Sequence, residues 1–126
     1  YTTLFRSPAH RPEDPIMKLC SVEQVMSEPA LAYFQFSPGA LDGIPWRHDS
    51  VYLPLAAFAR LAPAFHDHVR WFHAHGVTPL DAVDVQRLAG ALQVFATTSV
   101  DMAPLATSLA DWLLEHGGAG ITIERI

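Results

Sequence analysis

One segment of the sequence, residues 78–96, carries the clearest signal for a regular structure. Its large apolar residues recur at spacings of three and four, which place them on one face of an α-helix: Val85, Leu88, Leu92 and Phe95. Thr78, Pro79 and Asp81 come just before this stripe and match an N-cap, a first helical position and an acidic first turn. A helix of this kind has to bury its stripe against other elements of the same domain.

Two further segments show the same spacing. The first segment runs from Pro54 to Gly76, and its apolar positions are Phe58, Leu61, Phe65, Val69 and Phe72. Pro63 lies inside this segment and should kink or split the helix. Residues 69–77 could instead be extended. The second should be capped by Asp101 and ended by Gly117 and Gly118; its apolar positions are Met102, Leu105, Leu109, Trp112 and Leu113. The sequence therefore predicts a layer of three helices in the second half of the chain.

The remaining regular segments are shorter. Ser21 and Gln24 have the spacing of a capping box and predict a short helix before Pro29. Residues 31–36, 50–53 and 121–123 have the composition of strands. We expect an α+β fold in the order α-β-β-α-α-α-β, a small sheet of three or more strands packed against about four helices, with the last strand pairing with residues 31–36.

The first sixteen residues have a different character. The codons TAC ACG ACG CTC TTC CGA TCT would encode residues 1–7, a string that resembles the end of a short-read sequencing adapter read in frame. Three prolines in residues 8–15 exclude a helix there. We expect residues 1–16 to be a disordered, non-native leader, with a native disordered arm as the alternative for residues 8–16, and residues 17–126 to form a single domain.

Charge and composition exclude several classes of function. The formal net charge is −5, and it stays −5 without residues 1–16, which contain two arginines and two acidic residues. An acidic chain with one lysine has no basic surface for nucleic acid, and no stretch is apolar enough for a membrane span. Cys20 is the single cysteine, which excludes an intrachain disulfide and fits a cytoplasmic location.

The candidate contact surface is the long polar segment between the first two strands. Residues 37–50 contain turn-forming residues around one tryptophan, and loops of this length are often functional. Trp and Arg are enriched in interface hot spots, so the candidate binding residues are Trp46, Arg47, His48 and Asp49. The alternative is that Trp46 folds back as a lid on the sheet.

A metal site is the main alternative to a binding loop. The segment from His66 to His75 contains two His-x-His pairs, and His73, His75 and His48 could share a site if residues 72–77 were extended. On a helix, residues two apart point to different faces, which argues against chelation by either pair. Ser50 beside His48 and Asp49 supplies the residue types of a hydrolase, without any recognisable nucleophile motif.

These observations favour a small acidic cytosolic binding domain without an evident catalytic motif, such as an inhibitor or a toxin-neutralising immunity-type protein. Its partner would be another protein with a basic surface, and no cofactor is expected. The alternative is a metal-binding protein or metal-dependent enzyme using residues 66–75. A subunit or homodimer without chemistry of its own is a third interpretation.

Overall fold

The predicted α+β class is confirmed, and the expected elements appear in the expected order with one further strand. The computed structural model describes residues 18–27, 32–39, 46–68 and 76–126. The elements are α1 (Val22–Met26), β1 (Tyr33–Pro38), β2 (Val51–Pro54), α2 (Leu55–His68), β3 (Val77–Leu80), α3 (Ala82–Thr98), the 3₁₀ turn η2 (Val100–Met102), α4 (Ala103–His116) and β4 (Ile121–Arg125). The expectations for residues 1–16 and 69–75 lie outside the described residues. Among those described, no helix is both long and apolar enough to cross a bilayer.

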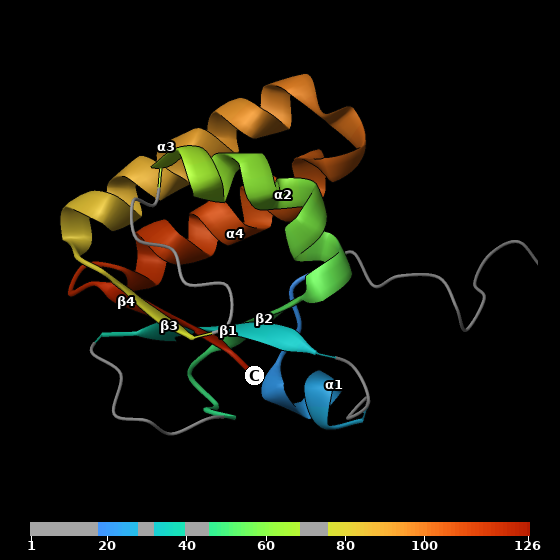
Figure 1. Cartoon of the computed structure of the whole chain (residues 1–126), viewed down its shortest axis with the longest axis vertical. Helices are drawn as coiled ribbons and strands as arrows, with labels where there is room; N and C mark the ends of the chain where they lie inside the picture. Colours follow the sequence, from blue (N-terminus) through green and yellow to red (C-terminus); the bar gives the residue numbers. More distant parts are fainter. Residues whose placement is uncertain (1–17, 28–31, 40–45, 69–75) are drawn as a thin grey trace, which may run out of the picture.

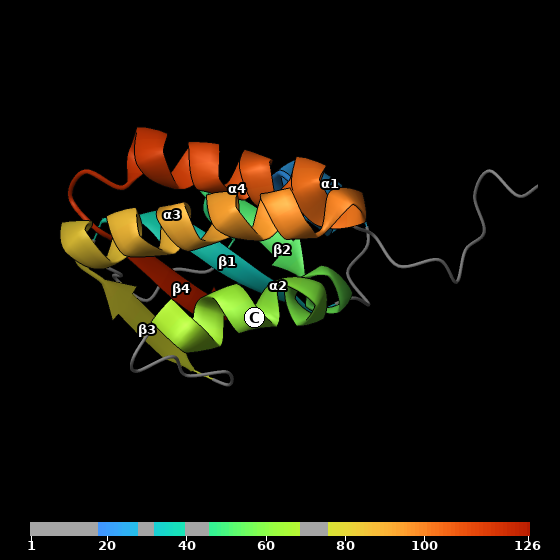
Figure 2. The same cartoon turned by 90° about the horizontal axis from the view of Figure 1, so that it is seen from above.

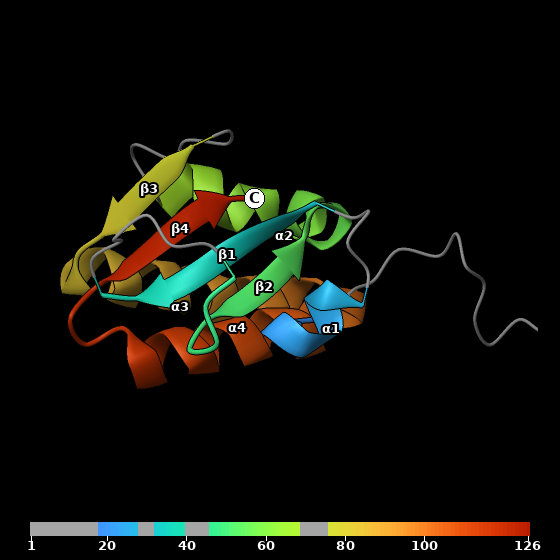
Figure 3. The ribbon, with the colours of Figure 1, turned by 90° about the horizontal axis from the view of Figure 1, so that it is seen from below.

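The four described strands form one antiparallel sheet in the order β2-β1-β4-β3 (Figure 3). The C-terminal strand β4 lies beside β1, as the sequence predicts, and Phe36 is the partner of Ile123. On its other side, β1 pairs with β2, with Gln35 opposite Tyr52. Because directly opposed residues share a face of the sheet, this register decides which side chains meet.

Helices α2, α3 and α4 cover one face of this sheet, and α1 lies on the other side beside β2 (Figures 1 and 2). The strands direct their apolar residues toward the three helices, and these residues are buried: Phe34, Phe36, Leu53, Ile121 and Ile123. The helical stripes meet them, with Phe58, Leu61 and Phe65 from α2 buried in the same cluster. Alternation of side chains along a strand and a three-to-four spacing along a helix therefore combine into one core.

Strand β3 corrects the expected start of the following helix. Thr78 is not the N-cap, because Val77–Leu80 pairs with β4 and the helix begins at Ala82. Asp81 is the N-cap, and its carboxylate accepts a hydrogen bond of 2.8 Å from the amide of Asp84. Asp caps a helix at least as well as Thr, so pairing of residues 77–80 with β4 decided between the two.

Pro79 is tolerated in β3 because of where its backbone points. The amide of Arg125 donates to the carbonyl of Gly76, so alternate residues from Gly76 onward bond to β4. Pro79 falls at an intervening position, and β3 is the last strand at its end of the described sheet. Its missing amide hydrogen therefore breaks no bond of the ladder.

Other helix boundaries partly follow the sequence. The capping box of Ser21 and Gln24 is confirmed, and Gly117 caps the end of α4. Asp101 is not the cap of α4, because it lies in η2, where Arg60 of α2 pairs with its carboxylate.

Helix α2 continues without a break through Pro63, although the sequence predicts a kink or a split there. Pro63 lies on the exposed side of the helix. Water can therefore bond the carbonyl group that has no amide partner because of the proline.

Candidate functional site

The sheet face away from the three large helices is polar and largely buried. The polar residues that point to this face include Gln35 and Ser37 from β1, Tyr52 from β2, and Thr122 and Glu124 from β4. Gln35, Ser37 and Thr122 are at most 2% exposed. A sheet face open to water normally carries solvated polar side chains, so burial here means that other segments cover the face.

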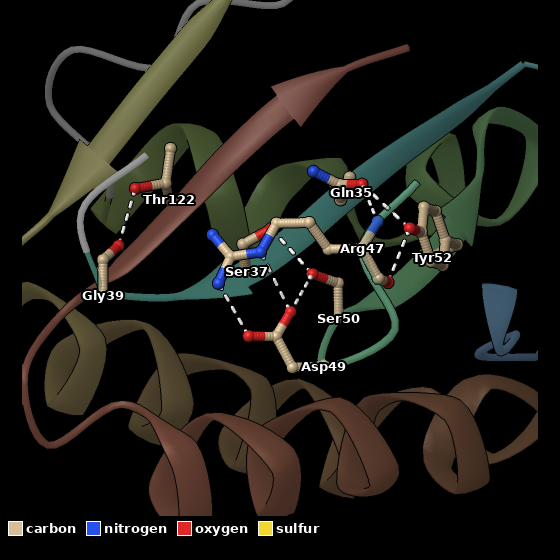
Figure 4. Close-up of polar contacts among 8 residues, drawn as sticks. All are labelled: Gln35, Ser37, Gly39, Arg47, Asp49, Ser50, Tyr52 and Thr122. Carbon is tan, nitrogen blue, oxygen red and sulfur yellow. Dashed lines mark hydrogen bonds and ion pairs between the residues drawn. The ribbon is translucent and has the colours of Figure 1, made fainter. Parts of the chain in front are cut away.

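The segment that leads into β2 provides part of this cover, and its tip, residues 46–49, is called the Trp46–Asp49 loop below. The backbone amide of Arg47 donates to Oε1 of Gln35 at 3.2 Å. The hydroxyl of Tyr52 donates to the same Oε1 at 2.8 Å and lies 2.9 Å from the carbonyl oxygen of Arg47 (Figure 4). Both backbone polar groups of Arg47 are thus bonded to buried side chains of the sheet.

Trp46 adopts an unusual backbone conformation at the start of this loop. Its φ is 61°, in the left-handed region that residues other than glycine rarely occupy. The indole stacks on the ring of Tyr52 with a centroid distance of 5.9 Å and an interplanar angle of 19°. It is partly buried and packs against a second apolar cluster, formed by Cys20, Val22, Val25, Tyr33 and Tyr52. The tryptophan therefore combines contact with the domain and partial exposure to solvent.

Arg47 and Asp49 form a two-point ion pair on the loop. Nε of Arg47 donates to Oδ1 of Asp49 at 3.0 Å, and Nη2 donates to Oδ2 at 2.7 Å (Figure 4). These hydrogen bonds from Arg47 lower the pKa of Asp49 below its usual value. The side chain of Asp49 is 51% exposed and that of Arg47 is 21% exposed. A bidentate pair of this kind fixes the plane of the guanidinium group.

The hydroxyl of Tyr52 is kept protonated by its surroundings. Burial raises its pKa to about 12, and the negative charge of Asp49 acts in the same direction. Tyr52 therefore stays protonated, and able to donate a hydrogen bond, above the pH at which an ordinary tyrosine ionises. Ser37 and Ser50 add a further bond on the same face, with 2.7 Å between their Oγ atoms.

His48 lies apart from these residues. Its side chain is 81% exposed, and its Nδ1 lies 3.5 Å from a carboxylate oxygen of Glu23 in α1. The hydroxyl of Ser50 instead bonds to Asp49 and Ser37, and no hydrogen bond joins His48 to Ser50 among the described residues. A catalytic triad requires the imidazole to bond the nucleophile, so the structure does not assemble one from these three neighbours in the sequence.

The metal-site alternative rests mainly on residues outside the described part of the chain. His73 and His75 both lie there, and only His48 of the proposed trio is described. Within the described ranges, no group of three His, Cys, Asp or Glu side chains is placed to hold a metal ion. Metal binding by His48, His73 and His75 thus stays a prediction.

Sequence reasoning identified the loop but missed the residues that hold it. Gln35 and Tyr52 are fully buried and belong to different strands, seventeen positions apart. A signal was present in the alternation of β1, where Gln35 and Ser37 interrupt a run of aromatic residues. Polar residues at every second position of a strand predict one polar face, which could have been connected to the neighbouring loop.

Comparisons of the chain with models of protein families, with curated proteins and with solved structures find no match.

Proposed function

We propose that this protein is a small acidic binding domain that contacts another protein through the Trp46–Asp49 loop. The observation that supports this function is the way in which the loop is held. Arg47 is bonded through its backbone to Gln35 and Tyr52, and through its side chain to Asp49. A loop that is ordered before binding loses less conformational entropy on association, which increases affinity.

The composition of the loop fits a contact surface. Trp46 offers the exposed part of a large aromatic ring, and Arg47 offers a fixed planar cation, the two residue types that dominate binding energy in many interfaces. Both contact Tyr52, whose side chain lies on the face of the sheet opposite the core formed with α2, α3 and α4. His48 and Asp49 are more exposed and would form the rim of the contact.

Charge favours a partner with a basic surface. The chain carries a net charge of −5, and two exposed carboxylates lie at this surface, that of Asp49 in the loop and that of Glu23 in the neighbouring α1. The long-range field of an acidic domain steers cationic partners toward it and increases the association rate. An inhibitor or a toxin-neutralising immunity-type protein would use such a surface to occupy a basic site on its target.

Photocrosslinking can identify the partner and the contact face in one experiment. A photoreactive phenylalanine analogue is placed at His48 and, in a separate variant, at Val94 of α3. The two positions are 81% and 66% exposed and lie on opposite sides of the sheet. We expect a specific adduct from position 48 and none of the same mass from position 94.

The captured protein is then purified and titrated against variants of the loop. Trp46→Ala or Arg47→Ala should weaken binding by about 30-fold or more, as at a hot spot, while Val94→Ala should change the affinity less than twofold. Melting curves establish that each variant is folded at the temperature of the titration. Unchanged affinity in both loop variants would rule out the loop as the contact surface.

A further inference from the structure

A buried polar clamp lies beneath the Trp46–Asp49 loop. It consists of Gln35 from β1 and Tyr52 from β2, which are opposed in the sheet and both 0% exposed. Oε1 of Gln35 accepts from the Arg47 amide, and the single proton of the Tyr52 hydroxyl is shared between Oε1 of Gln35 and the carbonyl oxygen of Arg47. The three groups form a closed ring of contacts that joins two strands to the loop (Figure 4).

The geometry points to Gln35 as the positioning residue that sets the conformation of the binding loop, with Tyr52 as its partner. Oε1 of Gln35 is the single atom that accepts from both the Arg47 amide and the Tyr52 hydroxyl. Removing this acceptor leaves the Arg47 amide to find another partner at a buried face, which is unfavourable, whereas the Tyr52 hydroxyl can still donate to the carbonyl of Arg47. Gln35 itself does not need to touch a partner in order to control the loop.

The backbone of Trp46 is the reason why a positioning residue is needed. A left-handed conformation at a residue with a side chain persists only where the surroundings impose it. Trp46 directly precedes the residue whose amide and carbonyl are clamped, and its ring stacks on the same Tyr52. The clamp thus holds the next peptide in place and fixes the direction in which the indole is presented.

The importance of Gln35 for binding rests on the proposed function of the loop. Its effect on the conformation of the loop can be tested without a partner. Amide hydrogen exchange of the full chain, followed by NMR, reports how often the bond from the Arg47 amide opens. The exchange of β4 amides in the same sample measures opening of the whole sheet. The ratio of the two separates a local effect on the loop from a general loss of stability.

Gln35→Met keeps the length of the side chain and removes the acceptor. We expect the protection of the Arg47 amide, relative to β4, to fall about fivefold to tenfold, the change that corresponds to the loss of one hydrogen bond. The three-bond coupling between the amide and α protons of Trp46, which depends on φ, should change at the same time. Thr122→Val is the matched control, because it removes another hydrogen bond of the same face, from Thr122 to the carbonyl of Gly39.

The outcomes are distinct. A fall in relative protection in Gln35→Met but not in Thr122→Val supports the clamp, and unchanged protection with an unchanged Trp46 coupling overturns it. If Gln35→Met does not fold, Tyr52→Phe tests the same ring from the other strand, with an expected decrease of about threefold and the same refuting result. Because exchange needs no partner, failure of the clamp and failure of the binding proposal appear in different experiments.

Discussion

Replacing Trp46 by glycine and by alanine should reverse the usual order of stability. Both changes remove the indole and its stacking on Tyr52, so the two variants differ only in the Cβ atom. At most positions glycine is the less stable residue, by roughly 0.5–1 kcal/mol, because it loses more backbone entropy on folding. The φ of 61° at Trp46 places the alanine Cβ in the left-handed region.

The magnitude follows from opposing effects. The left-handed conformation disfavours a residue with a Cβ by roughly 1–2 kcal/mol, and glycine is free of this penalty. After subtraction of the entropic disadvantage of glycine, we expect Trp46→Gly to be about 0.5–1 kcal/mol more stable than Trp46→Ala. Both should be about 2 kcal/mol less stable than the wild type, which is less than the roughly 3–5 kcal/mol for a fully buried tryptophan, because Trp46 is only partly buried.

Urea unfolding of the full chain, monitored by circular dichroism, measures these differences. Gln93 supplies the control, since it is exposed within the regular helix α3; there the alanine variant should be more stable than the glycine variant by about 1 kcal/mol. If Trp46→Ala is as stable as Trp46→Gly, or more stable, then the left-handed backbone is not imposed on residue 46. A loss near zero in both variants would refute the packing of the indole against the domain.

Four further predictions test other parts of the molecule. Leu92→Ala, at a fully buried position of α3, should lower the free energy of unfolding by about 2–5 kcal/mol, and a melt like that of the wild type would contradict the core position of this residue. The pKa of Tyr52 is raised to about 12 in the folded protein and is about 10 in an unfolded chain, so the contribution of Tyr52 to stability should be lost as pH rises from about 10 to 12. The difference in free energy of unfolding between wild type and Tyr52→Phe, measured with urea, should therefore decrease over that range. A constant difference would refute the protonated donor. Calorimetric titration with zinc of protein without a histidine tag should show no tight binding, and micromolar one-to-one binding that is lost in both His73→Ala and His75→Ala would establish the metal-binding alternative. Deleting residues 1–16 should leave the melting temperature within a few degrees, and a larger decrease would mean that this segment contributes to folding.

Local patterns in the sequence determined the core of this protein. The stripe of Leu88 and Leu92 predicted α3, and the capping box of Ser21 and Gln24 predicted the start of α1, because each signal depends on residues at most four positions apart. Pairing of the last strand with β1 followed from the need of a short strand for neighbours. The long polar segment with Trp46 was also evident as a candidate surface.

Tertiary structure alone decided the remaining features. Thr78 and Asp81 are both good caps, and only the pairing of residues 77–80 with β4 moved the start of the helix from one to the other. Gln35 contacts Tyr52 and Arg47 because the register of β1 with β2 brings together groups 12 and 17 positions apart. The left-handed backbone of Trp46 lies beside this contact and has no signal in the local sequence. Such contacts depend on sheet register and loop closure, and a shift of one residue in pairing would turn these side chains to the opposite face.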